Sequence, residues 1–131
     1  MTVAEIEQAK KVVPIVSIQN RYNITDRESE AALNYCEKQK MGFIPWAPIG
    51  GSGTRSLSKA GNALEAEAKR HNVSGVQLAL AWLLQKSPVM LPIPGTSSLA
   101  HLEENMAAEK LQLTPDEWRR IESLGRPHGI L

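Results

Sequence analysis

Three short apolar runs, separated by stretches with helix signals, constrain the fold of this chain more than any other feature. The runs cover residues 12–16, 42–46 and 89–91. Each is typical of a strand buried on both faces, and strands that alternate with helices require a parallel sheet with right-handed crossovers. We therefore expect an α/β fold of parallel βα units with three strands and about six helices. No repeat or low-complexity linker divides the chain, so residues 1–131 are expected to form a single domain.

Ser/Thr-x-x-Glu/Gln capping boxes predict where helices begin. The boxes are Thr2 with Glu5, Thr25 with Glu28, Ser74 with Gln77, and Thr114 with Glu117. The second box, or Asp26 beside it, would start a helix that runs to Lys40. The helix after Ser74 is apolar around its whole circumference, so it must be covered on most sides, and Trp82 in it is expected to be core.

Residues 91–105, LPIPGTSSLAHLEEN, predict the end of a strand, a turn rich in hydroxyl groups and the start of a helix with Leu99, Leu102 and Met106 on one face. Backbone N–H groups in the first turn of a helix have no intrahelical acceptor, and the helix dipole is positive there, so a phosphate could bind. The alternative is an ordinary Ser N-cap closing a βα loop, which is the commoner use of such a serine. Both interpretations fit these residues alone.

Composition and charge exclude several classes of partner. The 131 residues are 42% hydrophobic and 22% charged, which is typical of a soluble globular domain with a core. A net charge of +1 with mixed signs gives no basic surface for nucleic acid or an anionic membrane. No window reaches the roughly 18 apolar residues of a membrane span.

The single cysteine, Cys36, excludes an internal disulfide and favours a reducing cytoplasm. It is expected to be a small buried hydrophobe rather than a nucleophile. The three histidines have no metal-ligand spacing with it, so no metal site is predicted.

Four segments in this order, SIQNRYN, FIPWAPIGGS, VQLALAWLLQK and LPIPGTSSLAHLEEN, resemble the carboxy-terminal half of the aldo-keto reductases. These are NADPH-dependent oxidoreductases built on a (β/α)₈ barrel, and the tail LQLTPDEW extends the resemblance to nearly the whole chain. The resemblance implies that residues 12–18, 42–46 and 89–93 are barrel strands six, seven and eight. The expected fold is then a partial, half TIM-type barrel that carries the cofactor site.

Roles for the nicotinamide and pyrophosphate ends of the cofactor follow from the resemblance. Gln19 matches the glutamine that hydrogen-bonds the nicotinamide carboxamide; without the family it would be a polar residue that caps a loop. Trp46 stands where the family has an aromatic ring stacked on the nicotinamide, although the residues alone equally suit a core tryptophan. The loop past the pyrophosphate is matched by Ala47, Pro48, Ile49 and Gly50. The glycines that follow can let a ligand approach the backbone closely, or serve flexibility alone.

The adenosine end is implied at the turn described above. Thr96, Ser97 and Ser98 match the site of the 2′-phosphate, and Glu104 with Asn105 match the residues that contact the adenine. His101 stands in place of a frequent arginine, and Gly95 in place of a frequent lysine. The site would then rely on helix N–H groups, hydroxyls and a protonated His101. NADPH is the expected cofactor, with NADH as the alternative because discrimination would be reduced.

The family's catalytic residues, a Tyr general acid with Lys, Asp and His, lie on the first four barrel strands, and no part of this chain matches those strands. Tyr22 and Tyr35 belong to other elements and do not replace them, so we assign no catalytic residue. The chain resembles the NADPH-binding half of an enzyme that transfers hydride to a carbonyl, and we expect it to be inactive alone. The alternative is a non-catalytic half-barrel that self-associates or pairs with a complementary partner subunit.

Overall fold

A computed structural model describes residues 1–50 and 61–125, and its sheet consists of two parallel strands. Strand β1 (Ser17–Arg21) pairs with β2 (Gly42–Trp46), beginning with Ser17 opposite Gly42. In each strand alternate residues are buried, so the sheet is covered on one face and open on the other. This differs from the expectation that both faces would be covered.

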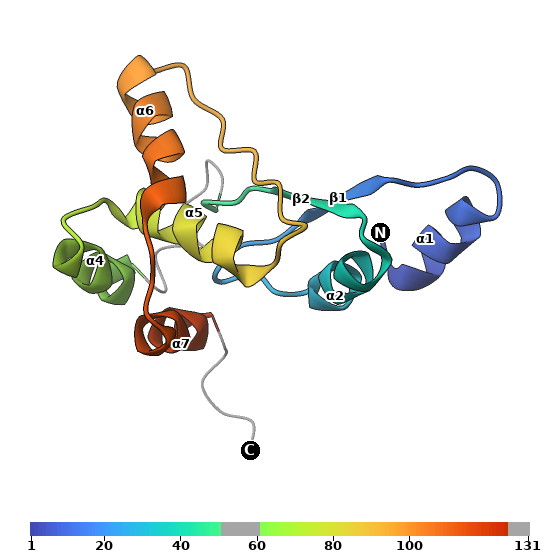
Figure 1. The fold of residues 1–131 in the computed structure, drawn as a ribbon, viewed down its shortest axis with the longest axis horizontal. Helices are drawn as coiled ribbons and strands as arrows, with labels where there is room; N and C mark the ends of the chain where they lie inside the picture. The colour runs from blue at the N-terminus through green and yellow to red at the C-terminus, as the bar shows by residue number, and fades with distance from the viewer. Residues whose placement is uncertain (51–60, 126–131) are drawn as a thin grey trace.

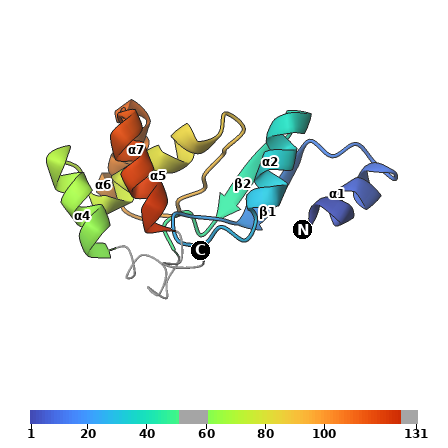
Figure 2. The same cartoon turned by 90° about the horizontal axis from the view of Figure 1, so that it is seen from below.

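The described ranges contain six α-helices, and Figures 1 and 2 show how they are arranged relative to the sheet. They are α1 (Val3–Lys10), α2 (Glu30–Gln39), α4 (Gly61–Arg70), α5 (Gly75–Lys86), α6 (Leu99–Ala107) and α7 (Pro115–Leu124), with a 3₁₀ turn η1 (Ala108–Lys110) after α6. The helices α4 to α7 gather at one end of the sheet, α2 packs beside β2, and α1 lies at the other end. Within 1–50 and 61–125, no helix is long and apolar enough to cross a membrane.

Three of the four predicted capping boxes mark the start of a helix correctly. The boxes at Thr2, Ser74 and Thr114 all form, each with both of its reciprocal hydrogen bonds. Helix α4 ends at Arg70, and Gly51 and Gly53 of the glycine-rich loop lie outside the described residues.

The core is built around α5, and the expectation that this helix must be covered on most sides is confirmed. Trp82 is fully buried and stacks between the rings of Tyr22 and Trp118, with ring centroids 6.2 and 6.3 Å away. Cys36 is also fully buried, and burial raises the pKa of its thiol. This agrees with its interpretation as a small hydrophobe.

A cluster of charged side chains lies beside this core and joins α2, α5 and α7. Glu122 on α7 accepts a hydrogen bond from Arg27 (Nη1 to Oε1, 3.0 Å) and one from Lys86 (Nζ to Oε1, 3.1 Å). Lys86 also reaches Glu30 on α2 at 2.8 Å, and Tyr22 donates its hydroxyl proton to the same Glu30 carboxylate. Burial and this hydrogen bond raise the pKa of Tyr22. We call these five residues the charge cluster.

The prediction of a strand at residues 12–16 is wrong. This segment is irregular and Val12 is 87% exposed, because β2 begins only at Gly42 and its register pairs it with Ser17 onward. A last backbone hydrogen bond, from Gly42 N to Val16 O at 2.9 Å, marks the end of the pairing. Residues before Val16 therefore have no strand to pair with.

The predicted third strand at residues 89–93 is reduced to a single parallel bridge between Phe43 and Met90. Phe43 donates to Val89 O and accepts from Leu91 N, each at 2.8 Å. Pairing stops there because Pro92 and Pro94 have no N–H to donate.

The predicted start of the second helix is also wrong, since α2 begins at Glu30 rather than after Thr25 or Asp26. The Asn23 side-chain oxygen accepts hydrogen bonds from the backbone N–H groups of Thr25 and Asp26, both at 3.0 Å. These bonds hold a turn in which the helix cannot begin.

Candidate functional site

The open face of the sheet carries the two residues predicted to meet a nicotinamide. Gln19 is exposed in the middle of β1, and Trp46 ends β2 with 42% of its surface exposed. Trp46 is therefore not a core residue. Arg21 lies beside it, with its guanidinium carbon 5.3 Å from the centroid of the Trp46 ring and its Nε 2.8 Å from an oxygen of Asp26. This cation covers part of the indole, so a flat ligand would stack where Arg21 leaves the ring free.

The loop after β2 turns sharply at Ala47, which has a positive φ of 51°. The carbonyl oxygen of Ala47 accepts two hydrogen bonds, from Gly50 N and from the side chain of Asn23, both at 3.0 Å. Pro48 and Gly50 are buried, and Gly50 has a φ of 98°, which favours glycine. The loop therefore has a defined course that carries the chain from Trp46 to Ile49.

The predicted anion turn forms an ordinary helix start. Ser98 is the N-cap of α6, and its hydroxyl accepts a hydrogen bond from His101 N at 3.4 Å. The Thr96 hydroxyl accepts from Ser98 N at 3.1 Å, so it braces the turn, while Ser97 is exposed. The N-cap interpretation is confirmed.

Six of the thirteen predicted cofactor residues meet around one cavity of about 230 Å³, which we call the α6 pocket. They come from three places in the chain: the loop after β2, the turn before α6 and α6 itself. The six are Ile49, Gly95, Thr96, His101, Glu104 and Asn105, and Val76 of α5 completes the wall. The cavity is smaller than the usual 300–1,000 Å³ of a small-molecule site, so it suits one portion of a larger ligand.

The remaining predicted residues lie outside this pocket. Gln19 and Trp46 are on the open sheet face, and residues 47–50 connect Trp46 to the pocket wall at Ile49. An extended ligand could follow this path from the sheet face to α6. No described atom lies within 4 Å of where a side chain on Gly95 would begin, so the pocket is open at that point.

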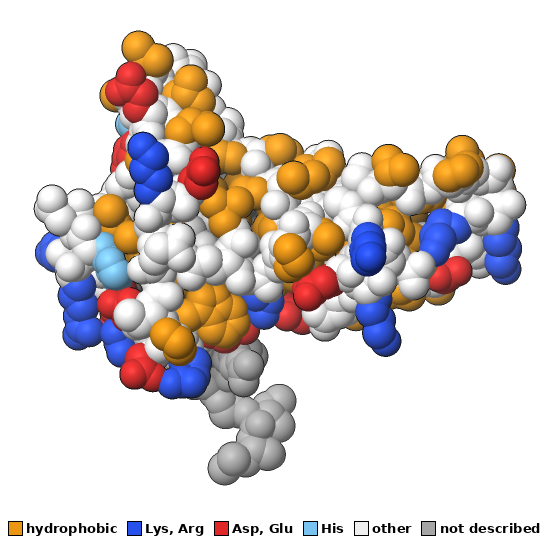
Figure 3. Space-filling model, viewed as in Figure 1, with side chains coloured by type: hydrophobic (Ala, Val, Ile, Leu, Met, Phe, Trp, Pro, Cys, Tyr) orange, Lys and Arg blue, Asp and Glu red, His pale blue; other side chains and the backbone are white. Residues whose placement is uncertain are grey.

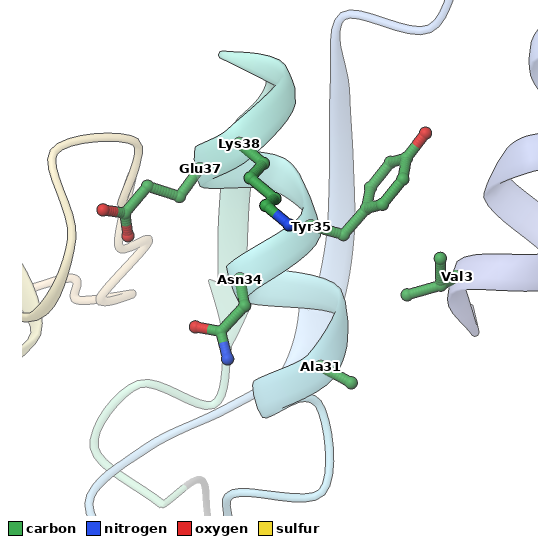
Figure 4. A pocket seen from close by; sticks show the side chains of 6 residues that line it. All are labelled: Val3, Ala31, Asn34, Tyr35, Glu37 and Lys38. Atoms are coloured by element: carbon green, nitrogen blue, oxygen red, sulfur yellow. The ribbon is translucent and has the colours of Figure 1, made fainter.

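A larger groove of about 650 Å³ between α1 and α2 contains none of the predicted residues. Figure 4 shows its labelled side chains: Glu37 and Tyr35 point to opposite sides of α2, and Val3 comes from α1. These groups do not converge on one point, so the groove is a poorer candidate for a binding site.

Three side chains that support the site were missed as functional residues. Asn23 holds the Ala47 carbonyl, Arg21 faces the Trp46 ring, and Gln77 donates from its Nε2 to the Glu104 carbonyl at 3.0 Å. Asn23 and Arg21 lie within the SIQNRYN segment, which is a signal for them, whereas the sequence around Gln77 indicates only a capping box.

The described ranges contain no group of three or more His, Cys, Asp or Glu side chains placed to hold a metal ion. The chemistry of the α6 pocket is instead that of an imidazole, a hydroxyl, an amide and one carboxylate. Such groups bind a polar organic ligand through hydrogen bonds.

Comparison with known protein families finds one that matches almost the whole chain. The sequence model of the Aldo/keto reductase family matches residues 1–126. The chain belongs to this family. The resemblance seen in the sequence motifs is thereby confirmed.

Individual relatives match almost the whole chain. It is 43% identical to an uncharacterized oxidoreductase of Schizosaccharomyces pombe and 39% identical to pyridoxine 4-dehydrogenase of Escherichia coli. Both alignments cover 96% of this chain, but only 40% and 43% of those proteins.

Two crystal structures extend the comparison to the fold. A thermostable aldo-keto reductase in complex with the inhibitor epalrestat superposes with a TM-score of 0.86 at 32% identity, over 95% of this chain and 46% of that one. An aldo-keto reductase from Klebsiella pneumoniae in complex with NADPH superposes with a TM-score of 0.84 at 22% identity, over 98% and 47%. The chain thus spans less than half the length of the relatives it matches.

Proposed function

We propose that residues 1–131 form a single domain that is the NADPH-binding half of an aldo-keto reductase barrel. One observation carries this proposal: Ile49 and five residues of the segment 95–105, far apart in sequence, meet around the α6 pocket. The NADPH bound to the Klebsiella pneumoniae protein of similar fold supports the choice of ligand. In the complete enzyme, the cofactor would supply a hydride to a carbonyl substrate.

Each group of residues would hold one part of the dinucleotide. Trp46 would offer a flat face to the nicotinamide ring, and Gln19 on the same sheet face would hydrogen-bond its carboxamide. The loop of Ala47, Pro48 and Gly50 would pass the pyrophosphate.

The α6 pocket would take the adenosine end. Thr96 and His101 would meet the 2′-phosphate beside Ser97 and the Ser98 N-cap, and Glu104 with Asn105 would contact the adenine. The donor groups fit a phosphate, since a hydroxyl, an imidazole and a helix N-terminus all favour an anion.

This half would be catalytically inactive alone. None of its residues matches the family's Tyr, Lys, Asp and His, and hydride transfer without a positioned proton donor loses a factor of about 10²–10⁴. The chain would bind and orient the cofactor, while the proton donor would come from the other half of the barrel.

Fluorescence titration of this chain with NADPH and NADH tests the proposal. We expect NADPH to bind more tightly, because only NADPH carries the 2′-phosphate. Introducing the lysine that the family frequently has, by Gly95→Lys, should strengthen NADPH binding about tenfold through a charge-assisted bond and leave NADH unchanged. There is room for it at Gly95.

Gly61→Lys is the matched control, since Gly61 is also open but lies in α4, outside the pocket. Equal gains from the two lysines would contradict a 2′-phosphate site in the α6 pocket. If neither cofactor binds, the proposed function is wrong for this chain.

A second candidate function, a non-catalytic half-barrel that self-associates or pairs with a complementary half, is favoured by the exposed apolar surface. A groove of about 580 Å³ runs between α6 and the segment after Met90, and its wall includes the exposed side chains of Leu84, Leu91, Ile93, Leu102 and Met106. Figure 3 shows hydrophobic side chains over α6 and along the adjoining edge of the molecule. Apolar patches of this kind mark interaction surfaces.

Sedimentation at micromolar concentration tests this second candidate. We expect dimers or larger species, and Leu102→Glu should shift them toward monomer because it places a charge in the groove. Val12→Glu, on an exposed valine outside the groove, should not. A monomer that binds no hydrophobic dye would contradict self-association.

A further inference from the structure

Gln77 joins two helices through the two ends of its side-chain amide. Its Oε1 accepts a hydrogen bond from Ser74 N at 3.2 Å, which completes the capping box of α5. Its Nε2 donates to the backbone carbonyl of Glu104 in α6 at 3.0 Å. The first bond is local to α5, whereas the second spans 27 residues.

The second bond acts on a helix that has little else to hold it. No residue of α6 is buried, and Leu99, Leu102 and Met106 on its apolar face are exposed. Glu104 lies in the last turn of α6, where the helix's own carbonyl pairing ends. The backbone N–H groups at the C-cap, Ala108, donate to the carbonyl oxygens of Asn105 and Met106. Gln77 thus ties the last turn of α6 to α5 with a donor from outside the helix.

The carbonyl that Gln77 holds belongs to the wall of the α6 pocket. Glu104 and Asn105 line the pocket from α6, and Val76, next to Gln77, lines it from α5. Residues of a helix have fixed angular positions about 100° apart. A rotation of α6 about its axis would therefore move the side chains of His101, Glu104 and Asn105 together. The bond from Gln77 resists that rotation.

We propose that Gln77 is a positioning residue, which sets the distance and rotation of α6 and thereby shapes the α6 pocket for the adenosine end of a dinucleotide. The ligand in this inference rests on the proposed function. The clamp itself can be tested without any ligand.

The chain offers a matched control in Gln85, near the other end of α5. Its Nε2 also donates to a backbone carbonyl, that of Leu111, at 2.8 Å. Residue type, helix and kind of bond are the same, but Leu111 lies outside the pocket.

Hydrogen exchange of the ligand-free chain tests the clamp. Gln77→Glu keeps the oxygen that caps α5 but loses the donor to Glu104, so it separates the two bonds. We expect backbone amides in the last two turns of α6 to exchange about fivefold faster in Gln77→Glu and in Gln77→Ala. This factor corresponds to the free energy of one lost hydrogen bond. Gln85→Ala should leave α6 unchanged. Exchange in α6 that is unaltered by Gln77→Glu would overturn the clamp and leave Gln77 as a cap only.

Binding then tests the purpose of the clamp. Gln77→Ala should weaken NADPH about fivefold and leave reduced nicotinamide mononucleotide, which has no adenosine, unchanged. An equal loss for both ligands would show general destabilisation and overturn the positioning role. If the unaltered chain binds no NADPH, the proposed function fails, while the exchange result still decides the clamp.

Discussion

Glu122→Gln is expected to lower the free energy of unfolding by about 3 kcal/mol, because it removes the anion at the centre of the charge cluster. Arg27 and Lys86 both bond to the same oxygen of Glu122, and their side chains are only 16% and 12% exposed. Glutamine has nearly the same shape, so packing is kept while the two cations lose their shared counter-charge. Lys86 retains its ion pair with Glu30, whereas Arg27 loses its carboxylate and keeps two carbonyl acceptors and its position over the rings of Tyr22 and Trp82.

Urea denaturation followed by far-ultraviolet circular dichroism measures this loss, and Asp116→Asn is its control. Asp116 pairs with Arg119 on α7, but both side chains are largely exposed, so water replaces the lost partner at a cost below about 1 kcal/mol. Similar losses for the two variants would show that the charge cluster is solvated and contributes little.

Gly125→Ala is expected to destabilise the chain by about 3 kcal/mol or to prevent folding. A Cβ on Gly125 would lie 1.6 Å from the carbonyl oxygen of Ile24, so the end of α7 and the loop after β1 would have to separate. The φ of Gly125 is −88°, which any residue can adopt, so the close approach of the two backbones is the whole reason for glycine here.

Gly75→Ala is the comparison for this substitution. A Cβ there would meet Glu65 Oε1 at 2.3 Å, but that atom ends a flexible and exposed side chain that can move away. Alanine also favours the helix, so the net change should stay within about 1 kcal/mol. If Gly125→Ala and Gly75→Ala have similar thermal unfolding temperatures, the contact between α7 and Ile24 is not a tight one.

Residue patterns predicted features of this chain that depend on a few neighbouring residues. The boxes at Thr2, Ser74 and Thr114 formed because both partners lie within one helical turn. Motifs also identified the family, since the residues that resemble it occur in short unbroken segments. The box at Thr25 does not form, and the reason is equally local. The backbone N–H groups of Thr25 and Asp26 donate to the side chain of Asn23, and this turn takes the place of a helix start.

Features that depend on partners far along the chain became visible only in three dimensions. The apolar run at residues 12–16 has every local mark of a strand, yet a strand forms only where β2 lies beside it. The bond from Arg27 to Glu122 joins residues 95 apart, and no periodicity within a helix reports such a distance.

The same division applies to the candidate site. The motifs marked Ile49, His101 and Glu104 separately, and folding placed all three around one cavity. Gln77 shows the division within a single side chain. Its bond to Ser74 can be predicted from a segment of four residues, whereas its bond to Glu104 exists because α5 and α6 pack together.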